Sequence, residues 1–245
     1  MKRIFLLLLL TVFTNSLYAQ DIFKALEDRD YIELEDILKD GAPTEQFNAK
    51  GLTPVWLAVF KNDTTALNLL IQYNADINFE EKNGMHPIMI GAIADSYECV
   101  KILLDNGVDV NWKSKRASRN QQPIRFASQG GSLKLVKLLL DHGANMEATP
   151  DDGGTPLLAS LHAKKFEIAE FYFNNGANVN VVGRDGETII HEAIKSGNPK
   201  MVKLALENNA PLNYEDTDGK STWQLAKKSG NSEIKTMIKD ALKEK

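Results

Sequence analysis

Covalent cross-links and catalytic sequence motifs are both missing from this chain. Cys99 is the only cysteine among 245 residues, so no disulfide can form within the chain and its stability has to come from packing. The sequence contains no CxxC, HExxH or GxSxG motif and no glycine-rich phosphate loop. Its four histidines form no pair at a metal-ligand spacing. We therefore predict that the protein is not an enzyme and has no catalytic residue, cofactor site or metal site.

An excess of positive charge is absent as well. The chain has 29 Lys and Arg side chains against 33 Asp and Glu, a net charge of −4. Broad nucleic-acid binding depends on basic side chains that neutralise phosphates, so we expect none here. Acidic pairs such as Asp151–Asp152 and Glu80–Glu81 fall in predicted turns, where we interpret them as solvated.

Long apolar runs are absent except at the start of the chain. Lys2 and Arg3 precede the run from Ile4 to Phe13, which is too short for the roughly 20 residues that span a bilayer. This layout, with a cleavage site after Ala19, predicts a signal peptide over residues 1–19 and no membrane span in the mature chain. A short leader on a chain with one cysteine favours export to the periplasm of a Gram-negative bacterium, with extracellular release as the second option.

What the chain does contain is a block of about thirty-three residues that repeats. Six segments with a shared pattern start 33, 36, 33, 33 and 33 residues apart. They are TPVWLA (53–58), HPIMIG (86–91), QPIRFA (122–127), TPLLAS (155–160), TIIHEA (188–193) and STWQLA (221–226). Self-similarity at such a period indicates a repeat array, which works by presenting surface.

Glycine and proline mark the ends of the expected helices in each block. Each block has a turn residue three positions before the Pro position. These residues are Gly51, Gly84, Asn120, Gly153, Gly186 and Gly219. A second series, at the expected helix C-termini, is Gly41, Asn74, Gly107, Gly143, Gly176 and Asn209. Gly and Asn are the residues that best tolerate a positive φ, so we predict left-handed backbone at both places. Pro54, Pro87, Pro123 and Pro156 are expected at the first position of a helix.

A second helix follows in each block. Its predicted N-caps are Asp30, Asp63, Ser96, Ser132, Asn198 and Asn231, with Lys165 as the exception. Apolar residues then recur at helical spacing, as in Leu67, Leu70, Ile71 and Val136, Leu139, Leu140. One helix pair cannot bury this stripe, so neighbouring repeats must stack. Cys99 is expected to be buried in one of these helices.

With these features the chain resembles the ankyrin-repeat family from about residue 21 to residue 240. The best copies of the family signature are Gly153–Ser160, Leu139–Asn145 and Tyr172–Asn180. The family's histidine is in register only at His191; Arg125 stands at the same position in another repeat. The resemblance implies an all-α solenoid of stacked helix-turn-helix units with β-hairpin-like turns. It also implies a non-catalytic protein–protein interaction scaffold.

We expect a single ankyrin-repeat domain over residues 20–245. Its predicted parts are a capping helix pair (21–49), repeats near 50–80, 81–113, 117–149, 150–182 and 183–215, and a C-terminal cap (216–245). The charged outer positions of both ends suit terminal repeats, which must be solvated.

Two surfaces and one further residue are candidate partner-binding sites. The end of each first helix carries Phe60, Ile93, Gln129, His162, Lys195 and Lys228, which we call the first-helix end positions. Phe60 and Ile93, beside Lys61, either pack under their own hairpins or form an apolar binding patch. The second surface is the hairpin tip lengthened by three residues, with Trp112, Lys113, Lys115, Arg116 and Arg119. The further residue is Arg125.

The sequence predicts a class of function and leaves the partner open. We expect a monomer that binds an unknown protein with an acidic surface, through hairpin tips and the concave helix face. The alternatives are a secreted effector that engages a host protein and an accessory subunit of an envelope enzyme.

Overall fold

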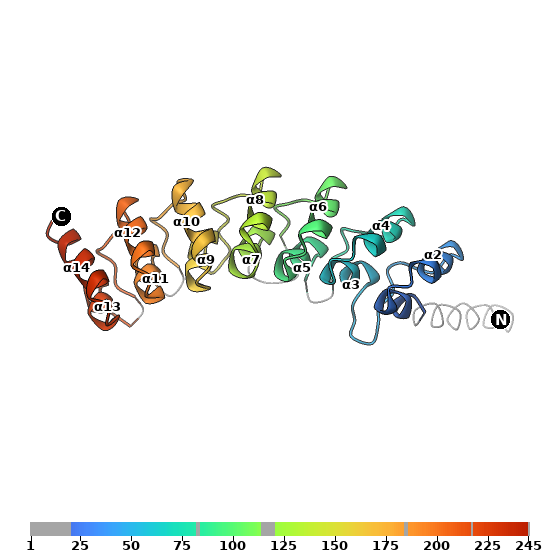
Figure 1. The fold of residues 1–245 in the computed structure, drawn as a ribbon, viewed down its shortest axis with the longest axis horizontal. Helices are drawn as coiled ribbons and strands as arrows, with labels where there is room; N and C mark the ends of the chain where they lie inside the picture. Colours follow the sequence, from blue (N-terminus) through green and yellow to red (C-terminus); the bar gives the residue numbers. More distant parts are fainter. Residues whose placement is uncertain (1–20, 82–83, 114–120, 184–185, 217, 245) are drawn as a thin grey trace, which may run out of the picture. The chain divides into compact units, whose positions relative to one another are not determined.

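The computed structural model describes residues 21–81, 84–113, 121–183, 186–216 and 218–244. These residues form short α-helices joined by turns, and no strand occurs among them (Figure 1). Isolated antiparallel bridges, Val182 with Thr188 and Glu215 with Ser221, give two of the connections a hairpin-like form. No helix in this described part is long and apolar enough to cross a membrane. The chain divides into two units, Met1–Asp109 and Val110–Lys245.

The first unit consists of consecutive helix pairs. Residues 21–28 are helical, and the helices that follow are α2 (Tyr31–Lys39), α3 (Pro54–Phe60), α4 (Thr64–Gln72), α5 (Pro87–Ala94) and α6 (Tyr97–Asp105). Within a repeat, α3 packs on α4 and α5 on α6. Between repeats, α3 contacts α5, and α4 contacts both α2 and α6. First helices and second helices therefore form two adjoining layers.

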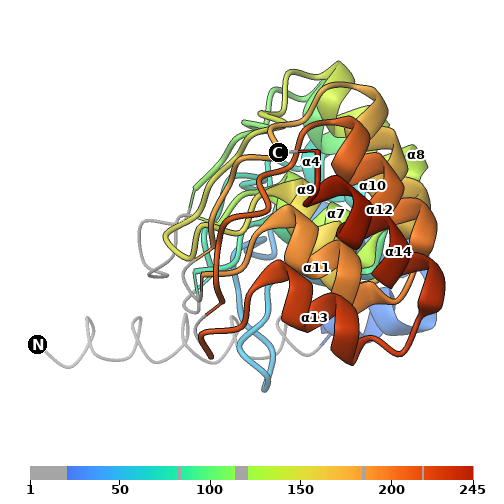
Figure 2. The same ribbon diagram turned by 90° about the vertical axis from the view of Figure 1, so that its left-hand side faces the viewer.

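The second unit repeats this arrangement. Its helices are α7 (Pro123–Gly130), α8 (Leu133–Asp141), α9 (Pro156–His162), α10 (Phe166–Asn174), α11 (Ile189–Ser196), α12 (Pro199–Glu207), α13 (Thr222–Lys228) and α14 (Ser232–Ala241). α7, α9, α11 and α13 pack in one row, and α8, α10, α12 and α14 in the other. Figure 2 shows the connections of this unit running out on one side of the helix pairs.

The predicted helix caps are confirmed almost throughout. The side chains of Asp30, Asp63, Ser132, Asn198 and Asn231 each accept a hydrogen bond from a backbone N–H in the first turn. Ser96 is the exception: it stands at the N-cap of α6 but makes no capping hydrogen bond. Lys165 precedes α10 without a cap, as expected. The four prolines open α3, α5, α7 and α9.

The glycine and asparagine series adopt the predicted left-handed backbone. Asn74 and Asn209 have φ angles of 61° and 62°, close to the 85° of Gly41 at the equivalent position. The turn glycine Gly153 has a φ of 71°. Asn120 lies outside the described residues. The replacement of Gly by Asn thus follows the backbone angle that each turn requires.

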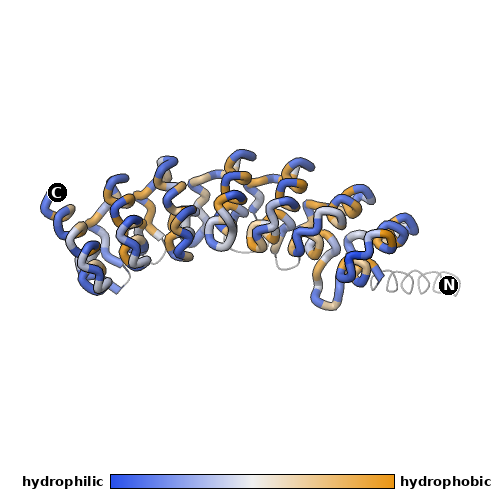
Figure 3. Tube along the Cα trace, viewed as in Figure 1, coloured by the Kyte–Doolittle hydropathy of each residue, from blue (hydrophilic) through white to orange (hydrophobic). Residues whose placement is uncertain are grey.

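The core consists of buried apolar residues in the first and second helices of the repeats. Figure 3 shows hydrophobic segments recurring along the chain. Leu67, Leu70, Val136 and Leu139 are fully buried, as predicted. The prediction was wrong for Ile71 and Leu140, which are only half-buried because they lie at the edge of the stripe. Cys99 is fully buried in α6, and burial raises the pKa of its thiol to about 12.

Candidate functional site

In the first unit, both first-helix end positions carry partly exposed apolar side chains, and we call Phe60 and Ile93 together the apolar surface. Phe60 is the last residue of α3 and is 49% exposed; Ile93 in α5 is 44% exposed. The two helices pack against each other, so the residues occupy matching places on neighbouring elements. The Phe60 ring stacks on Trp56, with ring centroids 4.9 Å apart. Neither side chain is fully covered by its own hairpin, and the role of the two residues in partner binding stays a prediction.

Lys61, the third predicted member of this surface, caps the C-terminus of α3. Its Nζ donates a hydrogen bond to the backbone oxygen of Leu26 at 3.5 Å, which links α3 to the helix over residues 21–28. The ammonium group thus has a structural contact beside the apolar surface.

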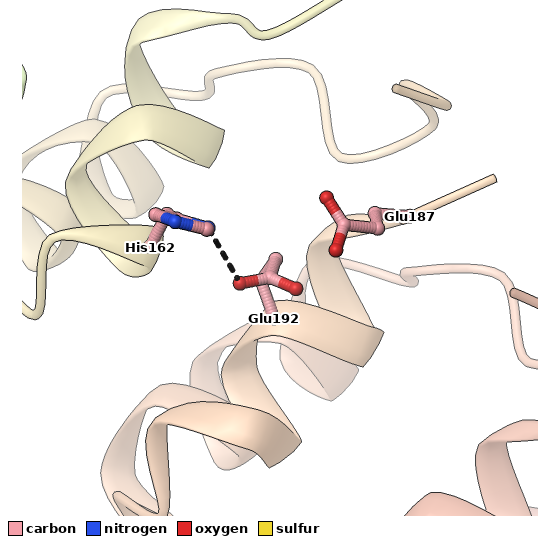
Figure 4. Close-up of side chains that lie close together, drawn as sticks. All are labelled: His162, Glu187 and Glu192. Carbon is pink, nitrogen blue, oxygen red and sulfur yellow. Dashed lines mark ion pairs between the residues drawn. The ribbon is translucent and has the colours of Figure 1, made fainter. Parts of the chain in front are cut away.

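In the second unit, the first-helix end positions are charged or polar, and two of them join an ionic cluster. His162 ends α9, Glu192 lies in the first turn of α11, and Glu187 lies in the turn before it. His162 Nδ1 is 3.4 Å from Glu192 Oε2 (Figure 4). Lys195 Nζ is 3.0 Å from Glu187 Oε1 and 3.2 Å from Glu192 Oε1. Burial lowers the pKa of Lys195, but the two glutamates outweigh it and hold that pKa above its usual value.

A cavity of about 400 Å³ adjoins this cluster. Its lining includes Lys195, Lys228, Asp216 and Asp218. Hydrogen bonds from the backbone N–H groups of Lys220 and Asp218 lower the pKa of Asp216 and keep it ionised. Both signs of charge therefore face this cavity, which suits polar groups.

The lengthened hairpin tip lies mostly outside the described residues. Lys115, Arg116 and Arg119 are among the residues that the structure does not describe. Of the two that it does, Trp112 is half-buried and Lys113 is exposed. The proposed role of the tip in recognition stays a prediction.

Arg125 is tied into the turn of the next repeat. Its guanidinium donates to the oxygens of Gly154 at 3.0 Å, Gln121 at 2.9 Å and Asp152 at 3.2 Å. Its side chain is only 17% exposed. Arg125 thus links two neighbouring repeats from the family's histidine position, as His191 does through the Thr222 hydroxyl. Its role in partner binding stays a prediction.

Two acidic side chains that were interpreted as solvated are not. Glu81 is 2% exposed, and its Oε1 accepts hydrogen bonds from the backbone N–H and the hydroxyl of Thr53 at 3.2 and 2.7 Å. Asp152 is largely covered and pairs with Arg125. That interpretation was wrong because each carboxylate meets a donor about 28 residues away, on an adjacent repeat.

Two buried histidines make contacts within the framework of the fold. His191 is fully buried, and its Nε2 lies 3.1 Å from the Thr222 hydroxyl. His86 stands at the N-cap of α5, and its Nδ1 accepts a hydrogen bond from the backbone N–H of Ile88. Burial lowers the pKa of His86 to about 4.

Comparisons with known proteins agree with this architecture. A family model described as "Ankyrin repeats (3 copies)" matches residues 22–114 and 158–242, and one described as "Ankyrin repeats (many copies)" matches residues 124–171. The human ASB11 ankyrin repeat domain, a crystal structure, superimposes with a TM-score of 0.77 at 20% identity. That superposition covers 89% of this chain and 96% of the ASB11 domain, and it shows the fold alone.

Curated relatives match in the repeats. The nuclear factor NF-kappa-B p105 subunit of Gallus gallus is 29% identical over 147 residues, which cover 58% of this chain and 15% of that protein. The putative ankyrin repeat protein FPV031 of fowlpox virus is 30% identical over 103 residues, or 41% of this chain and 30% of that protein. The chain thus spans less than a third of the length of these relatives.

Proposed function

Since this chain belongs to the ankyrin-repeat family, whose repeats indicate a protein–protein interaction scaffold, we propose that it is exported and binds a partner through the apolar first-helix end positions. The observation that carries this proposal is the exposure of Phe60 and Ile93 at matching positions on two packed helices. Exposed aromatic and aliphatic side chains on adjacent elements are what a partner can bury.

Two further features support the choice of partner and compartment. The basic tip around Lys113 favours a partner with an acidic surface, because opposite charge speeds association. The leader-like segment over residues 1–19 favours export, to the periplasm first and the cell exterior second. Fractionation of the cells that make the protein, with sequencing of its mature N-terminus, tests export: a start at Gln20 supports it, and an intact Met1 contradicts it.

Capture of partners from the envelope fraction tests the binding surface. The bait is the chain, and the variant carries Phe60→Asp with Ile93→Asp. Ile32→Asp is a matched control, because Ile32 is 78% exposed in the same unit and lies outside the first-helix end positions. We expect the double variant to lose a partner that the wild type and the control both retain. Equal capture by a folded double variant shows that this surface is not the site.

A further inference from the structure

The ionic cluster of the second unit brings a nitrogen ligand and two oxygen ligands together. His162, Glu187 and Glu192 each offer one ligand atom, and these atoms all lie within 4.8 Å of one another. Figure 4 shows the three side chains turned toward one another from adjacent repeats. The repeat of α9 supplies the imidazole, and the turn and first turn of α11 supply both carboxylates.

Glu192 is an unusual carboxylate because it is almost entirely covered. Its side chain is 6% exposed, and its Oε1 has no hydrogen-bond donor within the described part of the chain. Lys195 Nζ lies 3.2 Å from that oxygen but without the alignment of a hydrogen bond. An ionised carboxylate held out of water is costly unless a cation or a set of donors satisfies it. The buried Glu192 carboxylate therefore requires a cation beside it, and the Lys195 ammonium is the one present when no metal ion is bound.

We propose that His162, Glu187 and Glu192 form a binding site for a divalent transition-metal ion, with Zn²⁺ as the best fit. Imidazole nitrogen and carboxylate oxygen are ligands that Zn²⁺ takes in proteins, whereas Ca²⁺ and Mg²⁺ favour oxygen alone. Metal–ligand bonds of about 2.1 Å place tetrahedral ligand atoms roughly 3.4 Å apart, so the three groups must close by a small amount. His162 is 67% exposed and free to make that movement.

Lys195 is the competitor of the metal ion. Its ammonium pairs with both glutamates, so it holds the place of the cation when no metal is bound. Lys195 also lines the neighbouring cavity with Asp216 and Asp218. A displaced ammonium therefore has carboxylates within the same cavity to pair with. The metal site and the lysine ion pairs are two alternative ways to neutralise Glu187 and Glu192.

Binding of Zn²⁺ would join two neighbouring repeats. The imidazole comes from the repeat of α9 and the carboxylates come from the repeat of α11, which packs against it. A ligand that binds only the folded state raises its stability. The thermal midpoint of unfolding should therefore rise with Zn²⁺ concentration.

Calorimetric titration of the full chain with ZnCl₂, purified without a polyhistidine tag, tests the site. We expect one ion per chain in the wild type. His162→Ala and Glu192→Gln should each weaken binding by at least about tenfold. His142→Ala is the matched control, because His142 is also an exposed histidine that caps a helix in this unit. It should bind as the wild type does.

Lys195→Met separates the metal site from a network of ion pairs alone. With the competing ammonium removed, we expect Zn²⁺ to bind more tightly and to raise the thermal midpoint further than in the wild type. The proposal is overturned if neither the wild type nor Lys195→Met binds Zn²⁺. It is also overturned if His162→Ala and His142→Ala bind it equally.

Discussion

The two units of the chain carry different chemistry at the same position of the repeat. In the first unit the first-helix end positions hold exposed Phe60 and Ile93; in the second they include His162, Lys195 and Lys228. The N-caps, the positive-φ turn residues and the buried leucines are shared by both units. Positions that build the stack are therefore fixed by packing and backbone geometry. Positions at the exposed end of the first helix are free to differ, and recognition is expected there.

The largest effect should come from the shared core. Leu139 is fully buried in α8, so Leu139→Ala should lower the free energy of unfolding by about 2–5 kcal/mol. Leu140→Ala is the control. The Leu140 side chain is only half-buried, so its truncation should lower the free energy of unfolding by less. Denaturant unfolding measures both. Equal midpoints for Leu139→Ala and the wild type would contradict the assignment of the core.

A second difference between the units concerns the turn before the first helix. His86 occupies it before α5 in the first unit, whereas Thr53 occupies it before α3 in the same unit, and Thr155 and Thr188 occupy it before α9 and α11 in the second. Burial lowers the pKa of His86 to about 4, although Asp76, Glu80 and Asp109 pull it upward. Below pH 6.5 the His86 imidazole binds a proton in the unfolded state but stays neutral in the folded state. The free energy of unfolding therefore falls between pH 6.5 and pH 4.

We expect His86 to account for about 2 kcal/mol of lost stability between roughly pH 7.5 and pH 5. His86→Thr introduces the residue that three other repeats carry at this position, Thr53, Thr155 and Thr188, and should flatten this pH dependence. The variant keeps every carboxylate of the wild type, so the contribution of their titration cancels when the two pH dependences are compared. Denaturant unfolding at both pH values measures it, and identical pH dependence in the two proteins would contradict the prediction.

A third prediction places a lysine, as found at Lys195 and Lys228 in the second unit, at the first-helix end positions of the first unit. Phe60→Lys should cost about 1 kcal/mol, because it removes the stacking on Trp56. Ile93→Lys should change stability by less than about 0.5 kcal/mol. Partner capture should fall strongly in both variants. If the variant with both Phe60→Lys and Ile93→Lys captures the partner as well as the wild type does, the partner binds another surface.

The smallest effect on stability is expected at the lengthened hairpin tip. Reversal of Lys113, Lys115, Arg116 and Arg119 to Glu should slow association with an acidic partner and remove most of its salt dependence. The thermal midpoint should barely move, since insertions in a tip leave the stacked core untouched. Association rates at low and high salt measure the effect, and unchanged rates at low salt exclude the tip.

Local features of this fold could be predicted from the sequence, and contacts across repeats could not. An N-cap such as Asp63 or a turn residue such as Asn74 depends on a few neighbouring residues, so its pattern is readable. Glu192 meets His162 across 30 residues, and Glu81 meets Thr53 across 28. These separations differ from the period, because the two partners occupy different positions within their repeats. The sequence placed His162 at the correct end of its helix, but it gave no sign of the carboxylates facing it.

The burial of Cys99 makes the only thiol of the chain a reporter of local opening. With a pKa of about 12 and no exposed surface, the sulfur is protonated and unreachable while α6 stays packed. A thiol reagent can therefore react only in the moments when this helix separates from its neighbours. The rate at which a thiol reagent labels Cys99 therefore reports how often α6 opens. Comparison with the rate for a free thiol gives the free energy of opening, and no probe has to be introduced by mutation.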